Sequence, residues 1–150
     1  MMLVLIGGCS IFSRVDGTWL FHFEYESSYS GDCADNGDSG GDVQYTGTND
    51  VLVDIYKSGT GDVVVLLDEA LTGTVEGGEL DVSWDDSTTY DDSTSTYAYQ
   101  LTGEVGNGTL SGDYEFSQEY TGPGDDYTCS QSTAYEAERL VSDPDDYVGN

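Results

Sequence analysis

Apolar and polar residues alternate one by one through much of this 150-residue chain. In segment 19–25 the odd positions are aromatic, and the even positions hold Leu20, His22 and Glu24. A period of two places alternate side chains on opposite faces of a β-strand, whereas a helix would need a period near 3.6. The pattern therefore predicts strands with one buried face and an all-β fold.

Clusters of Gly, Asp, Asn and Ser separate the alternating segments, as is typical of turns between strands. We expect about eight strands, drawn from the segments 19–25, 43–46, 51–56, 63–67, 70–75, 79–84, 96–105, 110–116 and 127–140. Segments 27–42 and 85–95 are polar and are predicted to be loops, and Gly122-Pro123-Gly124 is predicted to break the chain. The continuous apolar run 63–67 predicts a strand that is more fully buried than its neighbours.

One internal repeat indicates how these strands connect. Residues 71–80 match residues 101–110, and each copy consists of a strand, a glycine turn and a second strand. Gly77-Gly78 and Asn107-Gly108 are strong hairpin turn signals. Two copies are too few for a solenoid, so the repeat predicts successive hairpins in an antiparallel up-and-down meander.

The N-terminus carries a short motif, Ile6-Gly7-Gly8-Cys9, that follows an apolar stretch. This motif resembles the lipobox of bacterial lipoproteins. The resemblance implies a signal segment at residues 1–9, a lipidated Cys9, a tether at residues 10–16 and a place outside the cytoplasm, at the outer membrane or cell surface. The membrane would then be a partner through the lipid anchor. The alternative is a buried N-terminal strand with an ordinary core cysteine.

With Cys9 assigned to lipid, Cys33 and Cys129 remain, and both lie in polar surroundings. Free buried cysteines more often lie in apolar strands, so we predict a Cys33–Cys129 disulfide, in keeping with an oxidising compartment. The bridge would join the region after the first strand to the last strand. Those strands are neighbours in a closed or nearly closed barrel, which we therefore favour over a β-sandwich.

Gly17-Thr18-Trp19 resembles the Gly-x-Trp that opens the first strand of lipocalins and related calycin barrels. That resemblance implies an eight-stranded barrel in which an arginine near the end of the last strand packs over the tryptophan. Arg139 stands at that place in this sequence. We accordingly place the barrel domain at residues 17–141 and an acidic tail at residues 142–150.

The charge is extreme, because 30 acidic residues face only three basic ones and the formal net charge is −27. Such a chain would repel phosphate backbones, so we expect no nucleic-acid partner. The charge favours solubility, including in high salt, or binding of divalent cations by carboxylate clusters. The candidate calcium ligands lie in one Gly-rich stretch and do not fit an EF-hand: Asp32, Asp35, Asp38 and Asp42.

No catalytic constellation is evident in the sequence, and we predict that the protein is not an enzyme. The single histidine, His22, falls on the polar face of its strand, and no serine is marked as its partner. The inward aromatic residues instead form the candidate ligand-binding set, because they could line an apolar pocket or fill the barrel completely. These residues are Trp19, Phe21, Phe23, Trp84, Tyr97, Tyr99, Tyr114 and Phe116.

Three functions fit these observations. The first is a lipid-anchored binding protein that holds a small apolar ligand or a partner protein. The second is a structural or surface-interaction lipoprotein with a filled core and no ligand. The third is a calcium-stabilised envelope domain. Calcium is the only cofactor that the sequence suggests.

Overall fold

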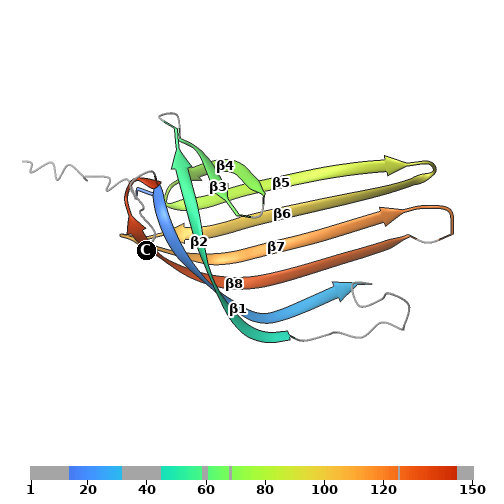
Figure 1. The fold of residues 1–150 in the computed structure, drawn as a ribbon, viewed down its shortest axis with the longest axis horizontal. Helices are drawn as coiled ribbons and strands as arrows, with labels where there is room; N and C mark the ends of the chain where they lie inside the picture. The colour runs from blue at the N-terminus through green and yellow to red at the C-terminus, as the bar shows by residue number, and fades with distance from the viewer. Residues whose placement is uncertain (1–13, 32–44, 59–60, 68, 125, 145–150) are drawn as a thin grey trace, which may run out of the picture.

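A computed structural model describes residues 14–31, 45–58, 61–67, 69–124 and 126–144 of the protein. Eight antiparallel strands follow one another around a closed barrel, in the order of the sequence (Figure 1). They are β1 Gly17–Gly31, β2 Tyr45–Lys57, β3 Asp62–Leu66, β4 Ala70–Glu76, β5 Glu79–Tyr90, β6 Ser93–Val105, β7 Thr109–Thr121 and β8 Tyr127–Val141. The all-β meander is confirmed.

Closure of the barrel rests on β1, which pairs with β2 along one side and with β8 along the other. In the β1–β8 ladder Phe21 lies opposite Ala137 and Phe23 lies opposite Tyr135. A register shift between Glu24 and Ser28 bends β1 before it rejoins β8. The barrel that we preferred to a sandwich is thus confirmed.

One end of the barrel is filled by a packed core beneath Trp19, whose side chain is fully buried. The Trp19 indole Nε1 donates a hydrogen bond to the Val15 carbonyl, at 2.8 Å. The guanidinium of Arg139 lies 5.8 Å from the Trp19 ring centroid, within the range of a cation–π interaction. This is the arrangement that the calycin-like Gly-x-Trp implied, and Val15 and Arg139 together close this end.

Two glycines make room for a buried tyrosine on the core side of the sheet. Gly103 pairs with Gly112, and Gly112 pairs with Tyr135. The Tyr135 hydroxyl donates to the Thr102 carbonyl at 3.0 Å, so the ring crosses β7 to reach β6. A Cβ at Gly103 would lie only 2.4 Å from that hydroxyl oxygen. Burial raises the pKa of the Tyr135 phenol, and the charge of Asp113 adds to the effect, so the hydroxyl keeps its proton.

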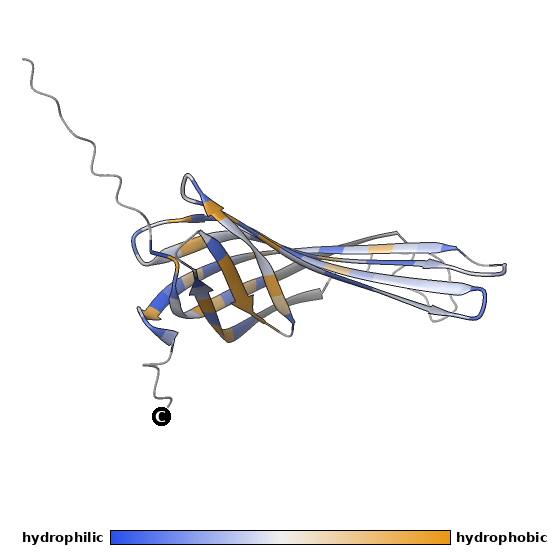
Figure 2. Ribbon diagram, turned by 90° about the horizontal axis from the view of Figure 1, so that it is seen from above, coloured by the Kyte–Doolittle hydropathy of each residue, from blue (hydrophilic) through white to orange (hydrophobic). Residues whose placement is uncertain are grey.

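The other end of the barrel opens because β3 and β4 are short. Pairing between β4 and β5 stops at Ser83, and pairing between β2 and β3 begins only at Asp54. Beyond that level β5, β6, β7, β8, β1 and the first half of β2 continue as a long twisted sheet (Figure 1). We call the level of β3 and β4 the closed end, and residues 84–100 and 114–133 the open end. Apolar residues gather at the closed end (Figure 2).

The predicted loop at residues 85–95 is wrong. Strand β5 runs to Tyr90, and β6 begins at Ser93 after a tight turn in which Asp91 has a φ of 50°. Aspartate tolerates this left-handed conformation, so the turn forms without glycine. The strands here are polar on the outer side and meet through hydroxyl pairs, for example Ser87 with Thr96 at 3.1 Å.

Two smaller expectations were also wrong. Residues 27–31 belong to β1 and pair with β8, so the loop predicted at 27–42 begins too early. The predicted strands 43–46 and 51–56 are not separate, because β2 runs unbroken from Tyr45 to Lys57. In β3 only Val63 and Val65 are buried, while Leu66 is 40% exposed, because the outer face of the barrel meets solvent.

Candidate functional site

The predicted aromatic set divides according to depth in the barrel. Trp19 and Phe21 are fully buried, and Phe23 is 5% exposed. The Phe21 and Tyr135 rings stack with centroids 4.8 Å apart, and Phe23 lies 5.9 Å from Tyr135. Trp19 and Phe21 therefore fill the closed end with packed side chains and line no open space there.

A cavity of about 300 Å³ lies directly above Phe23, at the mouth of the barrel. Its apolar walls come from inward side chains of β1, β2 and β7 and from the residue after β3: Phe23, Val51, Leu67, Tyr114 and Phe116. Leu52 and Leu66 stand at its edge, and they are 47% and 40% exposed. Three polar side chains, Asn49, Gln131 and Thr133, complete the lining. An apolar wall with a few polar groups is the usual composition of a small-molecule site. We call this space the mouth cavity.

The remaining predicted residues, Trp84, Tyr97 and Tyr99, lie further out on the same inner face. The Trp84 and Tyr99 ring centroids are 5.5 Å apart, and Tyr99 lies 5.2 Å from Phe116. All three side chains are half-buried. They extend the aromatic surface beyond the mouth cavity along β5 and β6.

Several inward residues of β7 and β8 were not in the predicted set. The strand predicted at 110–116 ended too early, whereas the strand predicted at 127–140 already covered the inward positions of β8. In β7 the inward parity continues from Tyr114 and Phe116 to Gln118 and Tyr120. In β8 the same face carries Tyr127, Gln131, Thr133 and Tyr135. The signal was present as continued alternation, but polar side chains at inward positions obscured it.

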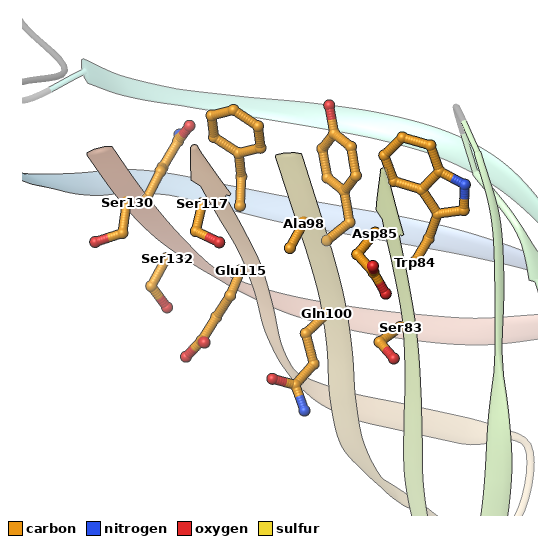
Figure 3. Close-up of a pocket in the computed structure, with 12 residues that line it drawn as sticks. Ser83, Trp84, Asp85, Ala98, Gln100, Glu115, Ser117, Ser130 and Ser132 are labelled. Atoms are coloured by element: carbon orange, nitrogen blue, oxygen red, sulfur yellow. The ribbon is translucent and has the colours of Figure 1, made fainter. Parts of the chain in front are cut away.

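The outer face of the open end forms a second hollow, of about 430 Å³ (Figure 3). Ser83, Gln100 and Ser132 project from one side of the sheet, and the Trp84 ring projects from the other. Its lining includes four serines, Ser83, Ser117, Ser130 and Ser132, together with the carboxylates of Asp85 and Glu115.

The predicted calcium ligands Asp32, Asp35, Asp38 and Asp42 lie outside the described residues, as do Cys9 and Cys33. Within the described ranges no three His, Cys, Asp or Glu side chains come together as a metal site. His22 is on the outer face, where its Nδ1 lies 2.5 Å from the Asp50 carboxylate. Cys129 is buried on the inner face, opposite Gly31 in the β1–β8 ladder.

Comparisons with known proteins add no relative: no family model, curated protein or solved structure matches the chain. The described part of the chain contains no helix long and apolar enough to cross a membrane.

Proposed function

We propose that this protein is an extracytoplasmic binding lipoprotein that holds a small apolar ligand in the mouth cavity. The observation that carries the proposal is the cavity itself, about 300 Å³ of space between Phe23 and the rim of β2 and β3. Its volume lies at the small end of ordinary ligand sites.

The chemistry of the lining defines the ligand class. Rings and aliphatic side chains form most of the wall, so burial of an apolar body is favourable. Asn49, Gln131 and Thr133 offer hydrogen bonds that would orient one polar group of the ligand. The net charge of −27 repels anions, so we expect a neutral ligand.

The place where β1 begins supports a lipid anchor at Cys9. Val15 is fully buried in the core, and β1 starts at Gly17, at the closed end. A tether that ends before Val15 would therefore fix the closed end to the membrane and leave the mouth cavity pointing away from it. An open mouth on the far side gives a ligand free access.

Fluorescence titration with N-phenyl-1-naphthylamine, a neutral apolar probe, tests the binding proposal. Thr133 lines the mouth cavity, and Thr133→Trp would fill it. Ala134→Trp is the matched control, because Ala134 is the next residue of β8 and is exposed on the outer face. We expect affinity to fall at least about tenfold in Thr133→Trp and to persist in Ala134→Trp. A wild-type protein that does not take up the probe, or equal binding by both variants, would refute the proposal.

Mass spectrometry of the membrane fraction tests the anchor separately. The expected N-terminal peptide begins at an acylated Cys9, and a Cys9→Ser variant should leave the membrane fraction. An unmodified Cys9 in membrane-associated protein would contradict the lipoprotein part of the proposal and leave the binding part intact.

A further inference from the structure

Beyond the mouth cavity, the inner face of β5 to β8 is arranged in three cross-strand rows. The strand register defines them: Trp84, Tyr99, Phe116 and Gln131; then Asp86, Tyr97, Gln118 and Cys129; then Thr88, Ser95, Tyr120 and Tyr127. Successive rows are two residues apart, so the rows span about 13 Å along the strands. We call the second and third rows, with Trp84 and Tyr99, the aromatic platform.

Half of the residues in these rows are aromatic, and Asp86 is the only one with a charge. The outer face of the same four strands carries no ring; its acids include Asp85, Glu115 and Glu119, and hydroxyl side chains surround them. The aromatic platform is thus a nearly uncharged face on a protein with a net charge of −27.

Hydrogen bonds join the polar groups of the aromatic platform, which are the Gln118 amide and the tyrosine hydroxyls. The Gln118 amide Nε2 donates to the Tyr127 hydroxyl at 3.0 Å and to the Tyr97 hydroxyl at 3.3 Å. Each phenol accepts from Gln118 and keeps its own O–H for donation to another group. Tyr120 and Tyr127 stack with centroids 5.2 Å apart, and the Tyr120 hydroxyl donates to Ser93.

This combination limits the ligand chemistry. A purely apolar ligand would strip water from the Gln118 amide and the phenols without replacing their hydrogen bonds, which is costly. A polyanion would be repelled by the net charge, and a polycation would be drawn to the carboxylates of the outer face. A neutral ligand with C–H faces and many hydroxyl groups satisfies both kinds of residue, because C–H groups pack on the negative faces of rings.

We propose that the aromatic platform binds a neutral polysaccharide or oligosaccharide. Tyr97, Tyr120 and Tyr127 supply stacking surfaces, and Gln118 together with the phenol hydroxyls supplies hydrogen bonds to sugar hydroxyls. Trp84 and Tyr99 continue the surface towards the barrel. This site is distinct from the mouth cavity and does not depend on the cavity holding a ligand.

Native gels that contain a soluble neutral polysaccharide test the site directly. Galactomannan, xyloglucan, hydroxyethylcellulose and pullulan are the probes, and serum albumin is the mobility reference. We expect the wild-type protein to be retarded in at least one gel, with affinity about tenfold lower in Tyr97→Ala. Thr96→Ala is the matched control, because Thr96 is the preceding residue of β6 and faces the outer side.

A second variant separates sugar binding from apolar binding. Gln118→Met keeps the length of the side chain but removes its amide, so retardation should be lost while uptake of N-phenyl-1-naphthylamine is unchanged. Circular dichroism of each variant confirms the fold. Three outcomes overturn the proposal. The first is a wild-type mobility, relative to albumin, that none of the four polysaccharides lowers. The second is unchanged retardation of folded Tyr97→Ala or Gln118→Met, and the third is equal retardation of the wild-type protein by an acidic polysaccharide.

Discussion

At the closed end the inward side chains of β6 and β7 are buried, whereas further along the same two strands they are half exposed. Leu101 and Leu110 are fully enclosed by the barrel. Tyr97 and Tyr120, on the same faces of the same strands, lie where β3 and β4 no longer cover them. The difference comes from the lengths of two neighbouring strands and not from the sequences of β6 and β7 alone.

We infer from this contrast that the closed end chiefly stabilises the fold and that the open end is available for binding. Burial of apolar surface at the closed end supplies most of the driving force for folding, because each buried large side chain contributes roughly 1.5–3 kcal/mol. The open end buries less, so its residues are available for ligands. Substitutions at the two ends should therefore have different consequences.

The largest effect is expected for Trp19→Ala. This change removes a fully buried ring and leaves a cavity at the closed end, so the free energy of unfolding should fall by about 3–5 kcal/mol. Tyr97→Ala, at the open end, should cost about 1 kcal/mol or less. Urea unfolding followed by circular dichroism measures both. Equal losses in the two variants would break the distinction between the ends.

The predicted Cys33–Cys129 disulfide would tie the open end together. Gly31, two residues before Cys33, already lies opposite Cys129 in the β1–β8 ladder. Reduction should lower the free energy of unfolding by about 2–5 kcal/mol, chiefly by loosening the unfolded chain. Urea unfolding with and without reductant gives the value, and Cys129→Ser is the control that reductant should not affect. A Cys33 thiol that alkylates without prior reduction would rule out the bridge.

Replacement of a glycine by alanine should cost more at the closed end than at the open end. In Gly103→Ala the new Cβ would lie 2.4 Å from the Tyr135 hydroxyl oxygen and 2.7 Å from the Ser111 carbonyl oxygen, so we expect a loss of about 1–3 kcal/mol. In Gly122→Ala, at the open end, the nearest atom is the hydroxyl oxygen of Tyr120, a side chain that can move aside. Thermal unfolding should show a clearly larger drop for Gly103→Ala, and the reverse order would contradict the close packing at the closed end.

Tyr135→Phe is the mildest change. It deletes the hydrogen bond to the Thr102 carbonyl and keeps the ring over the glycines, so we expect a loss of about 1 kcal/mol. Tyr127→Phe, whose hydroxyl accepts from Gln118 at the open end, is the paired control and should cost less. Chemical denaturation of both variants measures the difference. An equal cost would mean that depth in the barrel does not govern these hydrogen bonds.

The sequence predicted those parts of the fold in which alternation and turn chemistry coincide. The hairpins at Gly77-Gly78 and Asn107-Gly108 formed as expected, because glycine takes the positive φ that such tight turns need. The outer half of the β5–β6 hairpin was missed, because Asp91-Asp92 is an unusual turn and the flanking residues carry no apolar period.

Sequence alternation also predicted which way the aromatic side chains point, but not how deeply they are buried. Parity alone placed Trp19 and Tyr97 on the inner face, and both lie there. Their burial depends on where β3 and β4 end, which is a property of neighbouring strands. The division into core, mouth cavity and aromatic platform could therefore not be predicted from β1 or β6 alone.

Native-state hydrogen exchange along β6 and β7 tests the separation of the two ends most directly. We predict that amides of residues 101–105 and 109–112 exchange only through global unfolding, whereas those of 94–98 and 116–120 exchange faster through local opening. Both sets belong to the same ladder, so the comparison is internal to one molecule. Equal protection along the full length of β6 and β7 would contradict the separation of a stable closed end from a less stable open end.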